Sequence, residues 1–200
     1  LDRSSAASDV YKRQIERQRR EVNPHTLLEL VTTATRQGDF LSAHAFLDEL
    51  LVHVRHRNKN DSGLCECYMV FGKLVQAEGD LERAVQLYRA CLAGVEFNKM
   101  IWGQYLLYLA GSAAEIDRHE LTVKLLGTAE TVDGTIQPLF PIERGDYNRL
   151  AEAACAHLGA KRFDAAWAQG REQEFMQVAE ETVSILETAL RVKDHATPTS

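Results

Sequence analysis

The segment FDAAWAQGREQEF, residues 163–175, combines residue types that could form a binding site. It sets Trp167, Gly170 and Arg171 between two amphipathic stretches, so it could bind a ligand or only join two helices. We expect a joint, in which Trp167 packs its large apolar ring against the preceding helices. Gly170 should break a short helix and Arg171 should open the last one. A cation is poorly placed at the start of a helix, so Arg171 should have an acidic or carbonyl partner.

Other residues with possible chemistry are few. The sequence CEC at 65–67 offers two thiols, but no second Cys/His pair stands at zinc-ligand spacing. His53 and His56 lie one turn apart near a predicted helix end, where cations suit the helix dipole. The phosphate-binding motif G-x-x-x-x-G-K-[ST] does not occur, and no nucleophile motif does. We therefore expect no catalytic residue, no metal site and no cofactor.

Composition also restricts the class of protein. Apolar residues form 45% of the 200 residues and charged residues 26%, which is typical of globular proteins. The net charge of −6 argues against direct binding of nucleic acid, although KRQIERQRR at 12–20 leaves that alternative open. No apolar run approaches the ~20 residues that span a bilayer. The four cysteines are too few and too irregular for a disulfide framework, so we expect a reduced, cytoplasmic protein without membrane contact.

The elements that would position these residues are helices, and two of their boundaries repeat. RQGDF at 36–40 and AEGDL at 77–81 each end one apolar-periodic stretch and open another. The glycine permits the left-handed conformation that ends a helix, and the aspartate can cap the next helix. A third boundary lacks glycine, but Asp117 and Glu120 have capping-box spacing. Sustained strand-like alternation is absent from the sequence, so the fold class is all-α.

Small and bulky residues recur at matching places in three helix pairs, at a period of about 40 residues. Each pair has four such positions, which are small, small, bulky and small in that order. They are Gly72, Ala84, Tyr88 and Cys91 in the second pair, and Ala110, Thr122, Leu126 and Ala129 in the third. The first pair fits less well, with Val31, Ala43, Leu47 and Leu50. These pairs resemble tetratricopeptide repeats, which implies an α-solenoid of stacked helical hairpins. A generic helical bundle with similar caps is the alternative.

The C-terminal part carries a more specific resemblance. LLGTAE at 125–130 is followed by a loop with two prolines, by the E-R-x-x-Y helix of Glu143, Arg144 and Tyr147, and by LG…F-x-x-A-W-x-x-G-R from Leu158 to Arg171. This order resembles the end of the tetratricopeptide region in bacterial LuxR-type and AfsR-like transcriptional regulators and related predicted ATPases. In that family W-x-x-G-R is a structural signature, and ATPase and helix-turn-helix modules stand elsewhere in the chain. The helix after Arg171 departs from the family pattern.

Residues 1–14 are polar and have no helical stripe, so we expect a non-native or disordered tail there. After it we expect about three helix pairs at 15–133, a C-terminal helical cap at 134–190 and a polar tail or linker at 191–200. Pro141 should stand at the first position of a cap helix and Gly159 should end it. The chain would then be part of a longer protein.

The function that follows is a non-enzymatic interaction or sensory region, coupled to domains outside this chain. Its partner would be a protein or peptide, or another domain of the same polypeptide. A free-standing adaptor and a helical enzyme without a recognisable site are the alternatives. In tetratricopeptide arrays the first helix of each pair lines the binding groove. The residues at the matching positions of this sequence are His25, Leu28, Thr32, Arg36, Glu66, Met69, Lys73, Gln76, Gln104, Leu107 and Glu115.

Overall fold

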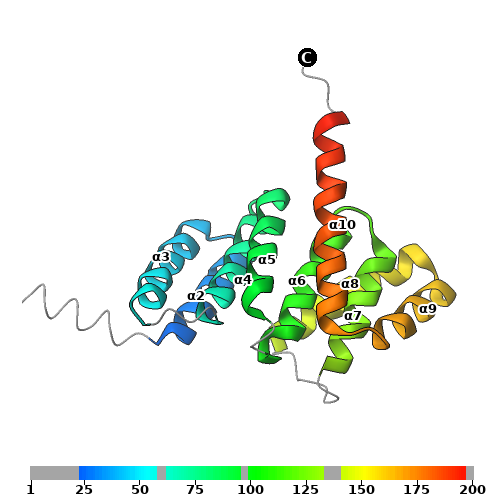
Figure 1. Cartoon of the computed structure of the whole chain (residues 1–200), viewed down its shortest axis with the longest axis horizontal. Coiled ribbons are helices and arrows are strands. Elements are labelled where there is room, and N and C mark those ends of the chain that lie inside the picture. The colour runs from blue at the N-terminus through cyan, green and yellow to red at the C-terminus, as the bar shows by residue number, and fades with distance from the viewer. Residues whose placement is uncertain (1–22, 58–61, 96–98, 133–140, 197–200) are drawn as a thin grey trace, which may run out of the picture. The chain divides into compact units, whose positions relative to one another are not determined.

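The computed structural model describes residues 23–57, 62–95, 99–132 and 141–196 (Figure 1). Every regular element in these ranges is a helix, so the all-α prediction is confirmed. The chain divides into two compact units, Leu1–Asn60 and Asp61–Ser200. The predicted tail at 1–14 lies outside the described residues. The expected boundary between repeats and cap, near residue 133, falls inside the second unit rather than between the units.

The described part of the first unit, residues 23–57, forms the helix pair of α2 (Pro24–Gln37) and α3 (Phe40–Arg57). The side chain of Asn23 caps α2 by accepting a bond from the amide of His25 at 3.1 Å. Gly38 ends α2 with φ of 73°, and the Asp39 carboxylate accepts a bond from the amide of Ser42 at 3.1 Å. The glycine and aspartate therefore act as the sequence predicted. The hydrogen bonds from Ser42 lower the pKa of Asp39. The two helices bury a common set of apolar residues, Leu27, Val31, Ala43, Leu47 and Leu50.

The second unit begins with α4 (Ser62–Ala77) and α5 (Leu81–Val95), joined by a turn of the same kind. Gly79 has φ of 94°, and the Asp80 carboxylate accepts a bond from the amide of Arg83 at 3.0 Å. Gly72 lies under the ring of Tyr88, where an added Cβ would be 2.5 Å from Cε1 of the ring. The two helices therefore cross closely at the predicted glycine.

The short 3-10 helix η1 (Lys99–Ile101) leads into α6 (Trp102–Glu115), which pairs with α7 (His119–Thr131). The capping box predicted for Asp117 and Glu120 is wrong, because Arg118 precedes α7 and no side chain caps it. Asp117 instead has φ of 58° and takes the left-handed place that glycine holds in the two earlier turns. The amide of Arg118 then donates to the carbonyl oxygen of Ala113 at 2.9 Å, which ends α6.

Residues 141–196 form α8 (Pro141–Leu158), α9 (Ala160–Arg171) and α10 (Phe175–Ala196). Helix α8 starts at Pro141 and stops before Gly159, as predicted. Helix α10 begins four residues later than the predicted opening at Arg171, and it continues to Ala196 through part of the predicted tail. Both α8 and α9 pack on α7, whereas α10 packs on α5 and α6.

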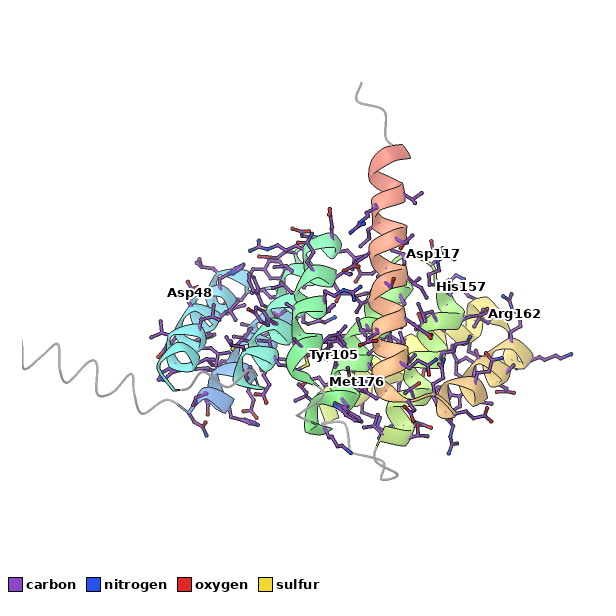
Figure 2. All side chains as sticks on the ribbon, in the orientation of Figure 1. Asp48, Tyr105, Asp117, His157, Arg162 and Met176 are labelled. Carbon is purple, nitrogen blue, oxygen red and sulfur yellow. The ribbon has the colours of Figure 1, made fainter. Side chains whose placement is uncertain are left out.

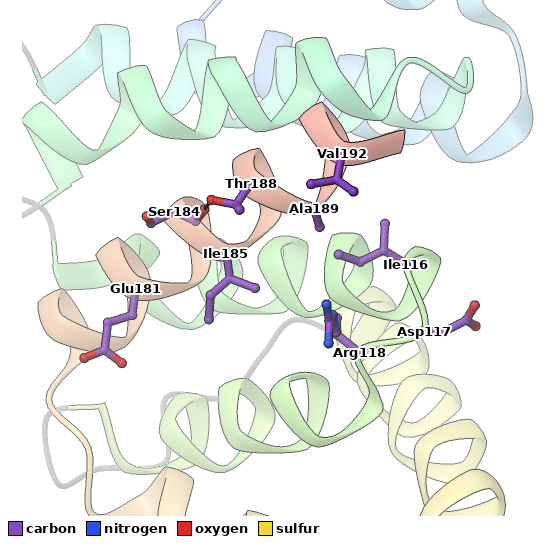
Figure 3. A pocket seen from close by; sticks show the side chains of 9 residues that line it. All are labelled: Ile116, Asp117, Arg118, Glu181, Ser184, Ile185, Thr188, Ala189 and Val192. Carbon is purple, nitrogen blue, oxygen red and sulfur yellow. Dashed lines mark hydrogen bonds between the residues drawn. The ribbon is translucent and has the colours of Figure 1, made fainter. Parts of the chain in front are cut away.

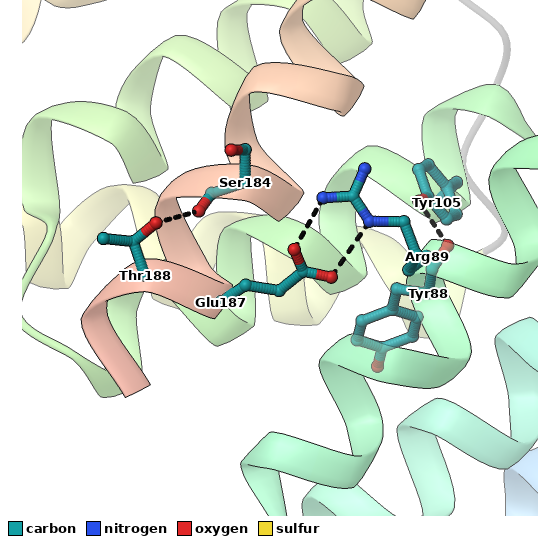
Figure 4. Close-up of polar contacts among 6 residues, drawn as sticks. All are labelled: Tyr88, Arg89, Tyr105, Ser184, Glu187 and Thr188. Carbon is teal, nitrogen blue, oxygen red and sulfur yellow. Dashed lines mark hydrogen bonds and ion pairs between the residues drawn. The ribbon is translucent and has the colours of Figure 1, made fainter. Parts of the chain in front are cut away.

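Two contacts attach α10 to the helices beneath it. At its start, the ring of Phe175 stacks on Trp102 of α6 with centroids 4.1 Å apart. Just past its middle, the carboxylate of Glu187 accepts two hydrogen bonds from the guanidinium of Arg89 in α5, at 2.9 and 2.8 Å (Figure 4). Beside this pair, the hydroxyl of Tyr105 donates to the carbonyl oxygen of Tyr88 at 2.8 Å, which links α6 to α5.

The joint at 163–175 differs from its prediction in two residues. Gly170 does not break a helix; it lies inside α9, buried, where an added Cβ would be 2.1 Å from the carbonyl oxygen of Lys124 in α7. Arg171 ends α9 rather than opening α10, so its charge suits the helix dipole and needs no special partner. Trp167 packs as predicted, edge-on to Tyr147 of α8 at 6.0 Å.

Candidate functional site

The best-defined polar hollow among the predicted groove residues lies where α4, α6 and α8 meet. It is a pocket of about 270 Å³ lined by Lys73, Leu107, Tyr108, Gly111, Ala114, Glu115, Asp146, Arg149 and Leu150. Lys73 comes from α4, five residues from α6 and three from α8. Residues of α4, α6 and α8 thus line one common surface, which we call the α4–α6–α8 face.

A buried chain of hydrogen bonds fixes one wall of this pocket. The hydroxyl of Tyr88, fully buried, donates to Oε1 of Gln76 at 2.9 Å. Nε2 of Gln76 in turn donates to the carboxylate of Glu115 at 2.6 Å. Gln76 is 4% exposed, so its amide has little freedom to turn toward another partner. The chain therefore holds the exposed carboxylate of Glu115 at the edge of the pocket.

Cationic and aromatic groups form the rest of the wall. Nζ of Lys73 lies 5.5 Å from the centre of the Tyr108 ring, a distance that favours cation–π attraction. The amide of Gln104 donates to the Tyr108 hydroxyl at 3.0 Å. Across the pocket, Arg149 pairs with Asp146 at 2.8 Å while keeping most of its side chain in solvent. The pocket thus offers both signs of charge and an aromatic ring.

The structure brings together most of the predicted groove residues of the second unit. Lys73, Leu107 and Glu115 line the pocket, and Gln76 and Gln104 bond to its wall. Met69 is 2% exposed and belongs to the core beneath, and Glu66 is half-buried on α4. Leu107 and Gln76 are also buried, so they shape the surface from below. The sequence analysis did not predict Tyr108 of α6, and it missed Asp146 and Arg149 because it did not extend the repeat positions into α8.

The predicted groove residues of the first unit lie on α2. His25 and Arg36 are exposed, whereas Leu28 and Thr32 are half-buried. His25 stands 3.4 Å from the carboxylate of Glu29, and the hydroxyl of Thr32 donates to the carbonyl oxygen of Leu28 at 2.9 Å. These four residues share one side of α2, in the first unit.

A second polar cluster surrounds the start of α7. The rings of His119 and His157 stack with centroids 4.1 Å apart, and Arg162 donates to the Glu120 carboxylate at 2.7 Å. Figure 2 labels Asp117, His157 and Arg162 on this side of the unit. The surrounding pocket measures about 530 Å³. Within the described ranges, no three His, Cys, Asp or Glu side chains are grouped to hold a metal ion.

Three of the cysteines are core residues. Cys65, Cys67 and Cys91 are at most 1% exposed, and the Sγ atoms of Cys65 and Cys91 lie 2.6 Å apart. Burial raises the pKa of Cys67 to about 12. The hydrogen bond between the Cys91 and Cys65 thiols, together with burial, raises the pKa of Cys91 as well. The thiols of Cys67 and Cys91 therefore stay protonated at neutral pH, and all three cysteines pack as small apolar groups.

We compared the chain with protein-family models, with curated proteins and with solved structures. None of them matches. Among the helices of the described part, none is long and apolar enough to cross a bilayer.

Proposed function

We propose that the helix pairs form a tetratricopeptide-like array whose α4–α6–α8 face binds a protein or peptide. The region would be a non-enzymatic, cytoplasmic part of a larger bacterial regulator of the LuxR or AfsR kind, or of a related signal-transduction ATPase. Binding on this face would be coupled to domains outside the chain. The observation that carries the proposal is the meeting of Lys73, Leu107 and Glu115 in one pocket.

The packing inside the second unit supports a repeat architecture. Gly72 fits under Tyr88 in the α4–α5 pair, at the place where helices of a tetratricopeptide hairpin cross. In the next pair, α6 and α7 meet at Ala110 and Thr122, and the Thr122 hydroxyl lies 3.4 Å from the carbonyl oxygen of Ala110. Both contacts involve the small positions that the repeat pattern assigned. Each pair leaves an apolar face that only a neighbour can cover, which favours stacking.

The chemistry of the α4–α6–α8 face supports a peptide as ligand. An extended chain offers backbone donors and acceptors together with charged side chains. Glu115 is held as an acceptor, while Lys73 and Arg149 present donors at the opposite walls. Leu107 and Leu150 add an apolar floor. These groups can make several weak contacts with a bound peptide, and they do not form the arrangement of a catalytic site.

A binding experiment tests the face directly. We expect a partner captured from bacterial lysate by the whole chain to be lost with Lys73→Glu and with Arg149→Glu. Lys161→Glu, an exposed lysine of α9 away from the pocket, is the matched control and should keep the partner. Equal capture by all three variants would remove the α4–α6–α8 face as the binding site.

The sequence of the complete gene distinguishes a regulator from a free-standing adaptor. The gene around this segment should encode a nucleotide-binding module and a helix-turn-helix or similar output domain. If the complete reading frame encodes neither, the regulator fails and a free-standing adaptor that binds a peptide in its groove becomes the better assignment.

A further inference from the structure

A hollow of about 890 Å³ lies between α10 and the turn that follows α6 (Figure 3). The residues that line it include no cysteine or histidine, and the hydroxyl of Thr188 already donates to the carbonyl oxygen of Ser184 at 2.8 Å. The strongest nucleophiles that a protein carries, its thiols, meet instead inside the α4–α5 pair.

Two buried thiols face each other where α4 packs on α5. Cys65 of α4 and Cys91 of α5 are at most 1% exposed, and their Sγ atoms lie 2.6 Å apart. The sulfur atoms of a disulfide are separated by about 2.05 Å, so a bond between these two needs a shift of only about half an ångström. The fold therefore places two oxidisable groups within bonding reach of each other.

The crossing of the two helices brings the thiols together. Gly72 of α4 lies under the ring of Tyr88 of α5, which fixes how the two helices are aligned. Because the helices are antiparallel, residues that precede Gly72 on α4 lie beside residues that follow Tyr88 on α5, and Cys65 meets Cys91 in this way. A disulfide forms only between cysteines whose side chains already point toward each other, and this pair meets that condition.

The other cysteines are less well placed to react with either thiol. Cys67 is on the same helix as Cys65, but residues two apart on a helix do not face each other. Cys155 is half-buried on α8, which packs on α6 and α7. Cys65 and Cys91 are therefore the specific pair.

Both thiols lie close to the end of a helix. Helix α4 begins at Ser62, shortly before Cys65, and α5 ends at Val95, shortly after Cys91. End turns open at a lower cost in free energy than the centre of a packed unit, so a small oxidant can reach the thiols through local opening. The hydrogen bond to Cys65 and burial raise the pKa of Cys91, so the closed pair reacts slowly and the opening sets the rate.

We propose that Cys65 and Cys91 are a site of reversible oxidation, at which a small disulfide such as oxidised glutathione cross-links α4 to α5. One thiol loses its proton and attacks a sulfur atom of the oxidant. A mixed disulfide forms, and the glutathione thiolate that leaves takes up the proton. The second thiol loses its proton in turn, attacks the protein sulfur of the mixed disulfide and releases the second glutathione. Two protein thiols thus lose two electrons, and one oxidised glutathione becomes two reduced molecules.

Mass spectrometry of the whole, folded chain treated with oxidised glutathione tests the proposal. After alkylation of free thiols and trypsin digestion, we expect the peptide 60–73 to be linked to the peptide 90–99, and dithiothreitol should release both. Cys67 shares the first peptide, so Cys67→Ser is the matched control and should keep the link, whereas Cys65→Ser should lose it. Glutathione added to Cys155 without any link between the two peptides would show that the oxidant had acted and would overturn the proposal.

Thermal unfolding gives an independent measurement. The link joins residues that are 26 apart in the chain and restricts the unfolded state, so oxidation of a Cys67→Ser, Cys155→Ser chain should raise its melting temperature by about 5–10 °C. A melting temperature that falls on oxidation, or a link that forms only in urea, would mean that the folded pair does not accommodate the bond.

Discussion

The hydroxyl of Thr128 in α7 donates a hydrogen bond of 2.7 Å to the carbonyl oxygen of Gly170 in α9. The last carbonyl groups of a helix have no partner within that helix, and this one also accepts a hydrogen bond from the amide of Gln173 at 3.2 Å. The contact is possible because α7 and α9 touch through their backbones. An added Cβ on Gly127 would stand 2.6 Å from the carbonyl oxygen of Trp167, and one on Gly170 would meet Lys124. Two glycines, one on each helix, thus allow the close crossing.

Gly170→Ala should destabilise the second unit strongly. The added methyl would stand 2.1 Å from a backbone oxygen that cannot move without shifting α7, so we expect a loss of about 3 kcal/mol or more. Gly145→Ala is the matched control, because Gly145 is exposed on α8 with no atom within 4 Å of the added methyl. The control should gain about 0.5–1 kcal/mol from helix propensity. Urea unfolding measures both, and equal stability of the two variants would contradict the close crossing.

Gly72→Ala should lower the free energy of unfolding, whereas Gly111→Ala should leave it unchanged or raise it slightly. The first forces the Tyr88 ring away from its place, because the methyl would be 2.5 Å from Cε1 of a ring that is fully buried and hydrogen-bonded. We expect a loss of about 1–3 kcal/mol in the free energy of unfolding. In the second variant the methyl lies 3.6 Å from Nε2 of Gln76, an ordinary contact, so stability should stay equal or rise slightly. Thermal unfolding followed by circular dichroism would show the difference.

The pair of Arg89 and Glu187 should contribute a small, pH-dependent stability. The bonds from Arg89 lower the pKa of Glu187, so the contribution is present above the ordinary value of 4.5 and is lost as pH falls through the lowered value. Both side chains are partly exposed and solvent screens them, so we expect about 0.5 kcal/mol at pH 7. A double-mutant cycle with Arg89→Gln and Glu187→Gln measures the coupling. A coupling that persists unchanged at pH 2.5 would contradict this account.

Alkaline pH should unfold the second unit. Burial raises the pKa of Tyr88 and Tyr105 well above 10.0, and it raises the pKa of Cys67 to about 12 from 9.0. Above pH 9 to 10 the unfolded chain releases these protons while the folded chain keeps them, so the free energy of unfolding falls as pH rises. Each such group lowers the free energy of unfolding by about 1.4 kcal/mol per pH unit, as long as it is ionised in the unfolded chain and protonated in the folded chain.

The fraction of folded chain measured between pH 8 and 11.5 checks this. Tyr88→Phe should reduce the slope above pH 10, even though its stability at pH 8 is lower because Gln76 loses a partner. An unchanged slope would exclude Tyr88 as a source of the alkaline loss.

Much of the local structure could be predicted from the sequence. Glycine followed by aspartate fixed the turns at Gly38 and Gly79, because few other residues adopt a positive φ and an aspartate can cap the next helix. Apolar spacing predicted the helices and most of the core. The small and bulky positions placed Gly72 where two adjacent helices cross, and the structure shows that the ring of Tyr88 fills the space there. These features depend on residues that are near one another in the chain.

The tertiary structure alone decided the roles of residues whose contacts lie far along the chain. Gly170 looked like a helix stop, yet it is small because the Lys124 backbone of another helix presses against it. Asp117 looked like a cap, yet it takes the left-handed place in a turn without glycine. The pocket joins Lys73 to Arg149 across three helices, a proximity that depends on how the pairs stack. Local structure depends on residues that are close in the sequence, whereas contacts between helices depend on how the whole chain packs.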